Sequence, residues 1–284
     1  MKFIFYSVPL LIFLLIFVSI FSQKKDQAIL NEYKINSESN KIIFLPKMLK
    51  EVSGLAFGGS DILYMHNDEE GIVYKFDMNK KKVVKEYELG EKHIKKDFED
   101  IAAINDSIYL ISSHGILYKF SLEDGHKEIP FQKIITGLNK KNNIEGLCYN
   151  PKTNSFLLAC KGFPGKGYKG YRAVYEFSLK NNKLKSKPLF LISLEQLKDE
   201  YNIKDFAPSG IELHKESGHF FLISAAPEVI IELDSQGILV NAKKFNDKIH
   251  KQPEGITFLN DGTLVISDEG KNHKGKLTII KKND

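Results

Sequence analysis

The sequence predicts an all-β protein, a five-bladed β-propeller in which an N-terminal strand closes the last blade. Three observations support this prediction. From residue 41 onward, short apolar runs alternate with clusters of Gly, Asn, Asp and Pro, which is typical of strands and turns. One sequence pattern recurs five times along the chain. Finally, the fifth copy lacks its last strand, while an extra apolar strand precedes the first copy.

Each copy begins with an anchor, a Ser or Glu followed by a Gly position and an apolar strand. The five Gly positions are spaced by 46, 46, 64 and 45 residues and are Gly54, Asp100, Gly146, Gly210 and Gly255. A period of about 40 to 50 residues is typical of four-stranded propeller blades. The long interval contains a Gly-rich loop and the plausible helix 191–205, so we interpret that copy as a blade with insertions.

The strand NKIIFLP at residues 40–46 has no blade of its own. Pairing it with the fifth copy would complete that blade and close the ring, which removes two unpaired sheet edges. A sixth blade would need another anchor, and the sequence contains none. A β-sandwich also holds many short strands, but it does not explain so regular a repeat.

We divide the chain into three parts. Residues 1–22 combine Lys2 with an almost unbroken apolar run, which indicates a signal peptide or, since the run is about 20 residues long, an uncleaved membrane anchor. Residues 23–40 are polar and are predicted to form a linker, and residues 41–284 form the propeller. We therefore expect an exported protein, periplasmic or anchored facing outward, with membrane contact only through an uncleaved N-terminal segment.

The charge distribution argues against a nucleic-acid partner. The net charge is +5, but Arg172 is the only arginine and the lysines are spread along the whole chain. Nucleic-acid sites usually concentrate Arg and Lys on one face.

The two cysteines, Cys148 and Cys160, lie on adjacent predicted strands, where a disulfide is possible and two buried free thiols are the simpler interpretation.

The anchors suggest a shared site. In a propeller the first strand of each blade lines the axis, so the five anchor residues should meet at one mouth of the central channel: Ser53, Glu99, Glu145, Ser209 and Glu254. The ends of the second strands add acidic residues, notably Asp68 and Asp268. Converging carboxylates repel one another unless a cation binds, and a set made wholly of oxygen ligands favours Ca²⁺. The alternative is that each Glu pairs with a lysine or with backbone amides.

The anchors EVSGLAF, DFEDIAAI, NIEGLCYN, APSGIELH and QPEGITFL, in this order, resemble the SdiA-regulated family of bacterial envelope proteins. The similarity extends over about residues 41–282. It implies a five-bladed propeller, distantly related to NHL-repeat propellers, with a bound calcium ion and often an N-terminal membrane segment. The sequence differs from this pattern at Asp100, where Gly is expected, and the change adds a ligand or alters a turn.

Three functions remain open from the sequence. The first is a non-enzymatic, Ca²⁺-binding module that presents its mouth to a small molecule or an envelope protein. The second is a Ca²⁺-dependent hydrolase of the phytase, esterase or lactonase kind, in which the same Glu residues with Asp68 and Asp268 hold the ion. The third is a scaffold without metal. No nucleophile with a neighbouring base is recognisable in the sequence, which favours the first.

Overall fold

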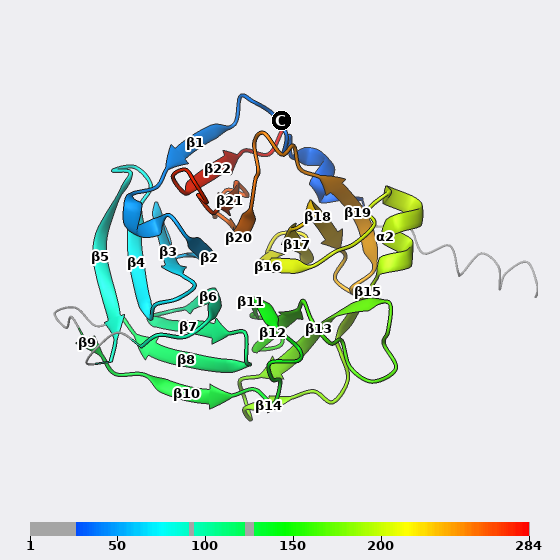
Figure 1. The fold of residues 1–284 in the computed structure, drawn as a ribbon, viewed down its shortest axis with the longest axis horizontal. Coiled ribbons are helices and arrows are strands. Elements are labelled where there is room, and N and C mark those ends of the chain that lie inside the picture. Colours follow the sequence, from blue (N-terminus) through cyan, green and yellow to red (C-terminus); the bar gives the residue numbers. More distant parts are fainter. Residues whose placement is uncertain (1–26, 91–93, 123–127, 284) are drawn as a thin grey trace, which may run out of the picture.

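Five antiparallel sheets surround a central axis in the computed structural model, which describes residues 27–90, 94–122 and 128–283 (Figure 1). The chain makes one blade after another, and the first strand of each blade lies nearest the axis. These inner strands contact one another in a closed ring, in the order β2, β6, β11, β16, β20 and back to β2. The predicted five-bladed propeller is confirmed.

Within blades 1 to 4, the strands are arranged in sequence order from the axis outward. Blade 1 contains β2 (Val52–Phe57), β3 (Ile62–Asn67), β4 (Ile72–Asp77) and β5 (Lys82–Leu89), with β9 (Glu128–Ile129) added parallel to β5. Blade 2 contains β6 (Phe98–Ile104), β7 (Ser107–Ser112), β8 (Ile116–Ser121) and β10 (Gln132–Ile135). Blade 3 contains β11 (Ile144–Asn150), β12 (Ser155–Cys160) and β13 (Tyr171–Ser178), which pairs with both β14 (Lys183–Leu184) and β15 (Phe190–Ser193). Blade 4 contains β16 (Pro208–His214), β17 (His219–Ala225), β18 (Glu228–Leu233) and β19 (Leu239–Lys244).

Blade 5 is built from both ends of the described chain. Its strands are β20 (Pro253–Phe258), β21 (Leu264–Asp268), β22 (Lys276–Ile280) and β1 (Lys41–Phe44). The β1 strand runs antiparallel to β22, with Ile43 opposite Leu277. This pairing confirms the predicted closure of the ring by the N-terminal strand.

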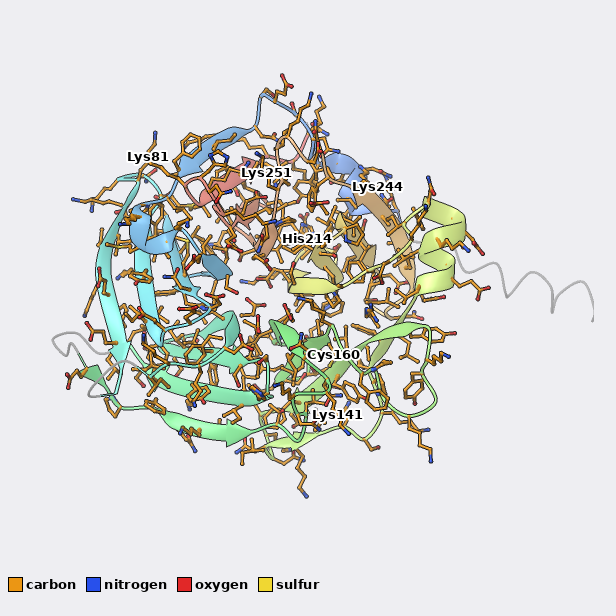
Figure 2. All side chains as sticks on the ribbon, viewed as in Figure 1. Lys81, Lys141, Cys160, His214, Lys244 and Lys251 are labelled. Atoms are coloured by element: carbon orange, nitrogen blue, oxygen red, sulfur yellow. The ribbon has the colours of Figure 1, made fainter. Side chains whose placement is uncertain are left out.

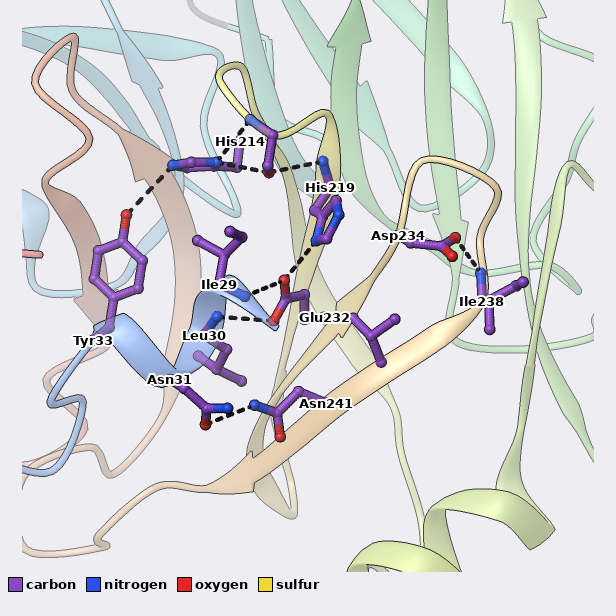
Figure 3. Close-up of polar contacts among 12 residues, drawn as sticks. Ile29, Leu30, Asn31, Tyr33, His214, His219, Glu232, Asp234, Ile238 and Asn241 are labelled. Carbon is purple, nitrogen blue, oxygen red and sulfur yellow. Dashed lines mark hydrogen bonds and ion pairs between the residues drawn. The ribbon is translucent and has the colours of Figure 1, made fainter. Parts of the chain in front are cut away.

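The described part of the polar stretch before β1, from residue 27 onward, packs on the propeller. A short 3-10 helix, η1 (Ile29–Glu32), begins the described segment, and Leu30, Tyr33 and Ile35 are buried between blades 4 and 5. The amides of Ile29 and Leu30 donate to the buried carboxylate of Glu232 on β18, each at 2.8 Å (Figure 3). The predicted signal peptide or anchor at residues 1–22 lies outside the described residues.

Other elements follow the sequence expectations closely. The predicted helix forms as α2 (Leu194–Tyr201), which Ser193 caps by accepting a hydrogen bond from the Gln196 amide at 3.1 Å. Cys148 and Cys160 are buried free thiols. Figure 2 places Lys81, on the turn between β4 and β5, at the outer edge of the propeller. None of the helices in the described part has the length and hydropathy that a membrane crossing requires.

In blades 1, 3, 4 and 5 a glycine follows the anchor and lies where backbones crowd the axis, whereas Asp100 takes this position in blade 2. A Cβ on Gly54 would lie 2.6 Å from Asp100 Oδ1 and 2.7 Å from His66 Nε2, and one on Gly210 would lie 2.8 Å from the Glu254 carbonyl oxygen. A side chain there would force neighbouring blades apart. The propeller therefore needs glycine at these positions for close packing.

His66 belongs to this crowded level, at the end of β3. Its Nε2 accepts a hydrogen bond from the Gly54 amide at 3.2 Å and its Nδ1 donates to the Asn67 carbonyl at 2.9 Å, so the ring is neutral in this arrangement. Burial lowers the pKa of His66 to about 4. Because the unfolded chain takes up this proton near pH 6.5, the folded state loses stability as the pH falls from 6.5 towards 4.

We expect His66→Gln to reduce the acid sensitivity of folding. Between pH 7 and pH 5, the free energy of unfolding of the wild type should fall by about 2 kcal/mol more than that of the variant. Denaturant unfolding at the two pH values measures the difference. His114→Gln, which changes the exposed histidine that follows the equivalent strand of blade 2, is the control and should behave as the wild type. Equal pH responses of wild type and His66→Gln would contradict this assignment.

Candidate functional site

Every anchor coincides with a β-bulge, and this determines where the anchor side chains point. In blade 3, Ile144 pairs with Cys160 and Gly146 with Ala159, which leaves Glu145 as the extra residue. The same shift occurs at Glu99, Ser209 and Glu254, and in blade 1 it spans Ser53 and Gly54. A bulge turns its side chain out of the regular alternation of the strand. The anchor residue of each blade can therefore leave the core while the strand that follows stays buried.

The acidic anchors share one cavity at the starting ends of the inner strands. This acidic cavity has a volume of about 310 Å³ and is lined by four of the five blades. Its ionisable residues are Glu51, Asp68, Asp97, Glu99, Glu145, Lys161, Glu254 and Glu269. Seven carboxyl groups thus face a single lysine, so the cavity is strongly electronegative if its carboxyl groups are ionised.

Four of the five predicted ligand residues line this cavity. They are Glu99, Glu145, Glu254 and Asp68. Asp68 follows β3, and its Oδ1 is buried without a hydrogen-bond partner among the described residues.

Asp268 does not reach the acidic cavity. It is buried at the end of β21, where its Oδ2 lies 2.8 Å from His250 Nδ1 and its Oδ1 accepts a hydrogen bond from the Gln252 amide at 3.3 Å. Asp268 pairs with Pro253 beside a bulge whose extra residue is Glu254 on β20, so the bulge turns Glu254 and not Asp268 towards the axis. Its neighbour Glu269, beyond the end of the strand, lines the cavity instead.

The two serine anchors join neighbouring blades. Ser53 donates from Oγ to the Glu99 carbonyl and Ser209 donates from Oγ to the Pro253 carbonyl, each at 2.7 Å. Ser209 does not line the acidic cavity, whereas Ser53 does. The serine anchors thus bind the start of the next inner strand, and the glutamate anchors supply carboxyl groups to the acidic cavity.

Asp100 is neither a cavity residue nor part of an altered turn. It is buried, its Oδ1 accepts from the Ile101 amide at 2.8 Å, and its Oδ2 accepts from the Leu147 amide of blade 3 at 2.7 Å. Burial raises the pKa of Asp100 well above its ordinary value. Its role is to connect the adjacent inner strands of blades 2 and 3.

Burial and mutual repulsion make ionisation of the cavity carboxyl groups unfavourable. Burial, followed by the charges of Glu145 and Asp97, raises the pKa of Glu99 to about 9. Burial, with a contribution from Glu145, raises the pKa of Glu254 to about 8. The pKa of Asp68 is also raised, chiefly by burial. A bound cation would offset this repulsion and favour the ionised forms.

Lys161 and Gln252 are site residues that the sequence reasoning missed. Lys161 Nζ lies 3.0 Å from Glu145 Oε1, and the side-chain Nε2 of Gln252 donates to Glu254 Oε1 at 2.9 Å. Burial opposes the charge of Lys161, but the carboxylates of Glu145 and its neighbours outweigh it and raise the lysine pKa. A signal was present, because Lys161 follows the second strand of blade 3 as Asp68 follows that of blade 1.

The donor chemistry of the acidic cavity fits calcium, although the side chains do not converge on one point. Carboxylate and amide oxygens are the ligands that Ca²⁺ takes, in sets of about six to eight. Among the described residues, no three His, Cys, Asp or Glu side chains are close enough together to hold a metal ion. Binding would therefore require side-chain rotations that draw the carboxylates inward, and Glu145 would have to leave Lys161.

Comparison with known proteins agrees with the family and the fold. The model of the SdiA-regulated family matches residues 25–272. No curated protein matches the sequence. A luciferin-regenerating enzyme is similar in structure, with a TM-score of 0.50 and 13% identity over 86% of this chain and 97% of that one. A streptogramin B lyase has a TM-score of 0.48 and 10% identity, over 84% of this chain and 97% of the other. The likeness to the luciferin-regenerating enzyme, at 13% identity, shows a shared fold alone and leaves the chemistry to the site.

Proposed function

This chain belongs to the SdiA-regulated family, and we propose that it is a calcium-binding, non-enzymatic β-propeller of the cell envelope that presents its acidic cavity to a ligand. The observation that carries the proposal is the imbalance of charge in the acidic cavity, where seven carboxyl groups face Lys161 alone. The apolar run within residues 1–22 supports export, with the propeller periplasmic or anchored facing outward.

The residues that would hold the ion are Glu99, Glu145 and Glu254, with Asp68 as a fourth ligand. The three glutamates come from the bulges of three different blades, so a cation bound among them would connect blades 2, 3 and 5. Asp68 contributes a buried oxygen without a partner in the described structure. When bound, Ca²⁺ would supply positive charge and open coordination positions for an anionic or carbonyl group of a ligand, either a small molecule or an envelope protein.

We expect Ca²⁺ to raise the melting temperature of the purified protein in a concentration-dependent way, because a ligand that binds only the folded state stabilises it. The triple variant Glu99→Gln, Glu145→Gln, Glu254→Gln keeps the side-chain shapes and should lose most of this shift. Lys161→Gln removes the ammonium that competes for Glu145, and its shift should appear at lower Ca²⁺ concentration than that of the wild type.

The matched control removes three exposed carboxylates, with the same change in net charge: Glu38→Gln, Asp199→Asn, Asp247→Asn. It should respond to Ca²⁺ as the wild type does. The proposal fails if the wild type shows no shift, or if the two triple variants respond equally.

A further inference from the structure

A second cavity lies at the opposite ends of the inner strands. It has a volume of about 260 Å³ and is lined by residues from all five blades. The acidic cavity is lined by residues at the starts of these strands, and the crowded glycine level lies between the two. The walls of this distal cavity are mainly apolar and include Phe57, Ile101, Leu147, Tyr149 and Phe258.

One carboxylate, that of Glu212 on β16, lies among these apolar walls. Its Oε1 accepts a hydrogen bond from the Leu213 amide at 2.8 Å, and its Oε2 accepts one from Thr257 Oγ1 at 3.2 Å. The thiol of Cys148 lies 3.7 Å from Oε1. No basic side chain among the described residues forms an ion pair with Glu212, and Lys215 is exposed at the rim. The carboxyl group is thus hydrogen-bonded, and burial raises its pKa. Among the described residues, Lys215 is the only basic side chain that lines the cavity, and it forms no ion pair with Glu212.

We propose that the distal cavity binds a small organic amine, with its ammonium group against Glu212 and its apolar body among Phe57, Leu147 and Phe258. A buried carboxylate without a counter-ion gains most from a ligand that brings a positive charge. An organic cation suits the walls, since apolar and aromatic side chains favour its body and aromatic faces attract ammonium groups.

Other ligand classes fit the distal cavity less well. A calcium ion takes about six to eight oxygen ligands, and one carboxylate with one hydroxyl among apolar walls does not provide them. An anion would meet the charge of Glu212, and a neutral apolar molecule would leave that charge uncompensated. The volume is slightly below the range of about 300 to 1,000 Å³ typical of sites for drug-sized ligands, which indicates a molecule of fragment size.

Three compounds of similar size but different charge test which ligand the distal cavity binds. 2-Phenylethylamine carries the ammonium, 2-phenylethanol is neutral, and 3-phenylpropanoate is anionic. In calorimetric or NMR titrations of the protein at pH 7, the amine should bind at least about tenfold more tightly than either comparator, as expected for a charge-assisted contact. Equal binding of the alcohol or the acid, or no binding of the amine, overturns the proposal.

Variants at the two ends of the axis locate the amine. Glu212→Gln should weaken amine binding by about tenfold or more, since it keeps the shape and removes the charge. The triple glutamine variant of the acidic cavity should leave amine binding unchanged. If the triple variant loses the amine and Glu212→Gln keeps it, the amine binds at the acidic cavity and the proposal is wrong.

The exposed residue Lys215 provides a test that does not depend on how Glu212→Gln folds. Lys215→Gln removes a positive charge from the rim, so it should tighten binding of the amine and weaken that of the acid. Weaker amine binding in Lys215→Gln would overturn the proposal. The melting temperature of each variant is measured alongside, and these outcomes are independent of whether Ca²⁺ binds at the acidic cavity.

Discussion

Glu232→Ala should destabilise the protein by about 3 to 5 kcal/mol and release the segment before β1, because removing one member of a buried, charge-assisted network leaves its partners unsatisfied. The Glu232 side chain is fully buried and accepts hydrogen bonds from the amides of Ile29 and Leu30. Its Oε1 also lies 2.6 Å from Nδ1 of His219 (Figure 3). Three contacts to the Glu232 carboxylate are lost in this variant.

Two measurements check this prediction. Denaturant unfolding gives the loss of stability, and hydrogen exchange reports on the amides of Ile29 and Leu30, which should exchange faster in the variant. Asn241→Ala is the matched control on the neighbouring strand, because it removes only the exposed 3.0 Å hydrogen bond to Asn31 (Figure 3). It should cost less than about 1 kcal/mol. Unchanged exchange in Glu232→Ala would show that the carboxylate does not hold the segment.

Asp100→Ala should destabilise the protein by about 3 kcal/mol, because it leaves the amides of Ile101 and Leu147 without a partner in a buried place, at about 1 to 3 kcal/mol each. Denaturant unfolding measures this loss. Ser53→Ala is the control, since it removes a single donor between blades 1 and 2 and should cost about 1 kcal/mol.

The same variant separates stability from cation binding. Asp100 does not line the acidic cavity, so Asp100→Ala should keep the Ca²⁺-dependent rise in melting temperature. Loss of that rise, with the fold intact, would instead assign Asp100 a role as a ligand.

The architecture could be predicted from the sequence because a propeller repeats both its strand pattern and its turn chemistry. The spacing of the anchors gave the blade number, and the unmatched strand at residues 40–46 gave the closure of the ring. Only part of the candidate site could be predicted from the sequence. Glu99, Glu145, Glu254 and Asp68 were found as repeated acidic positions. Asp268 was expected beside them, but it pairs with Pro253 in the ladder and its side chain contacts His250.

The remaining features depend on contacts between distant parts of the chain. The bulges that aim the glutamates arise from pairing between strands, which one strand alone does not reveal. The docking of residues 29–35 uses three apolar side chains, Leu30, Tyr33 and Ile35, without a helical or strand period. Their partners on blades 4 and 5 lie about 200 residues later, as the hydrogen bond between Leu30 and Glu232 illustrates. The Asp100 link between blades likewise replaces a glycine that the repeat pattern predicts.

The pairing of β1 with β22 also has a consequence for the order of folding. Blades 2 to 4 and the four main strands of blade 1 can form in sequence order as the chain is synthesised. Blade 5 waits for β22, which follows all the strands of blades 1 to 4 in the sequence. Until then β1 lacks its partner strand. Tyr33 also lacks its β-bridge to Lys282, and Glu32 lacks its ion pair with Lys282, in which Oε2 lies 2.8 Å from Nζ. The completed ring is therefore a late event, and truncation before residue 276 leaves an open arc with two unpaired edges.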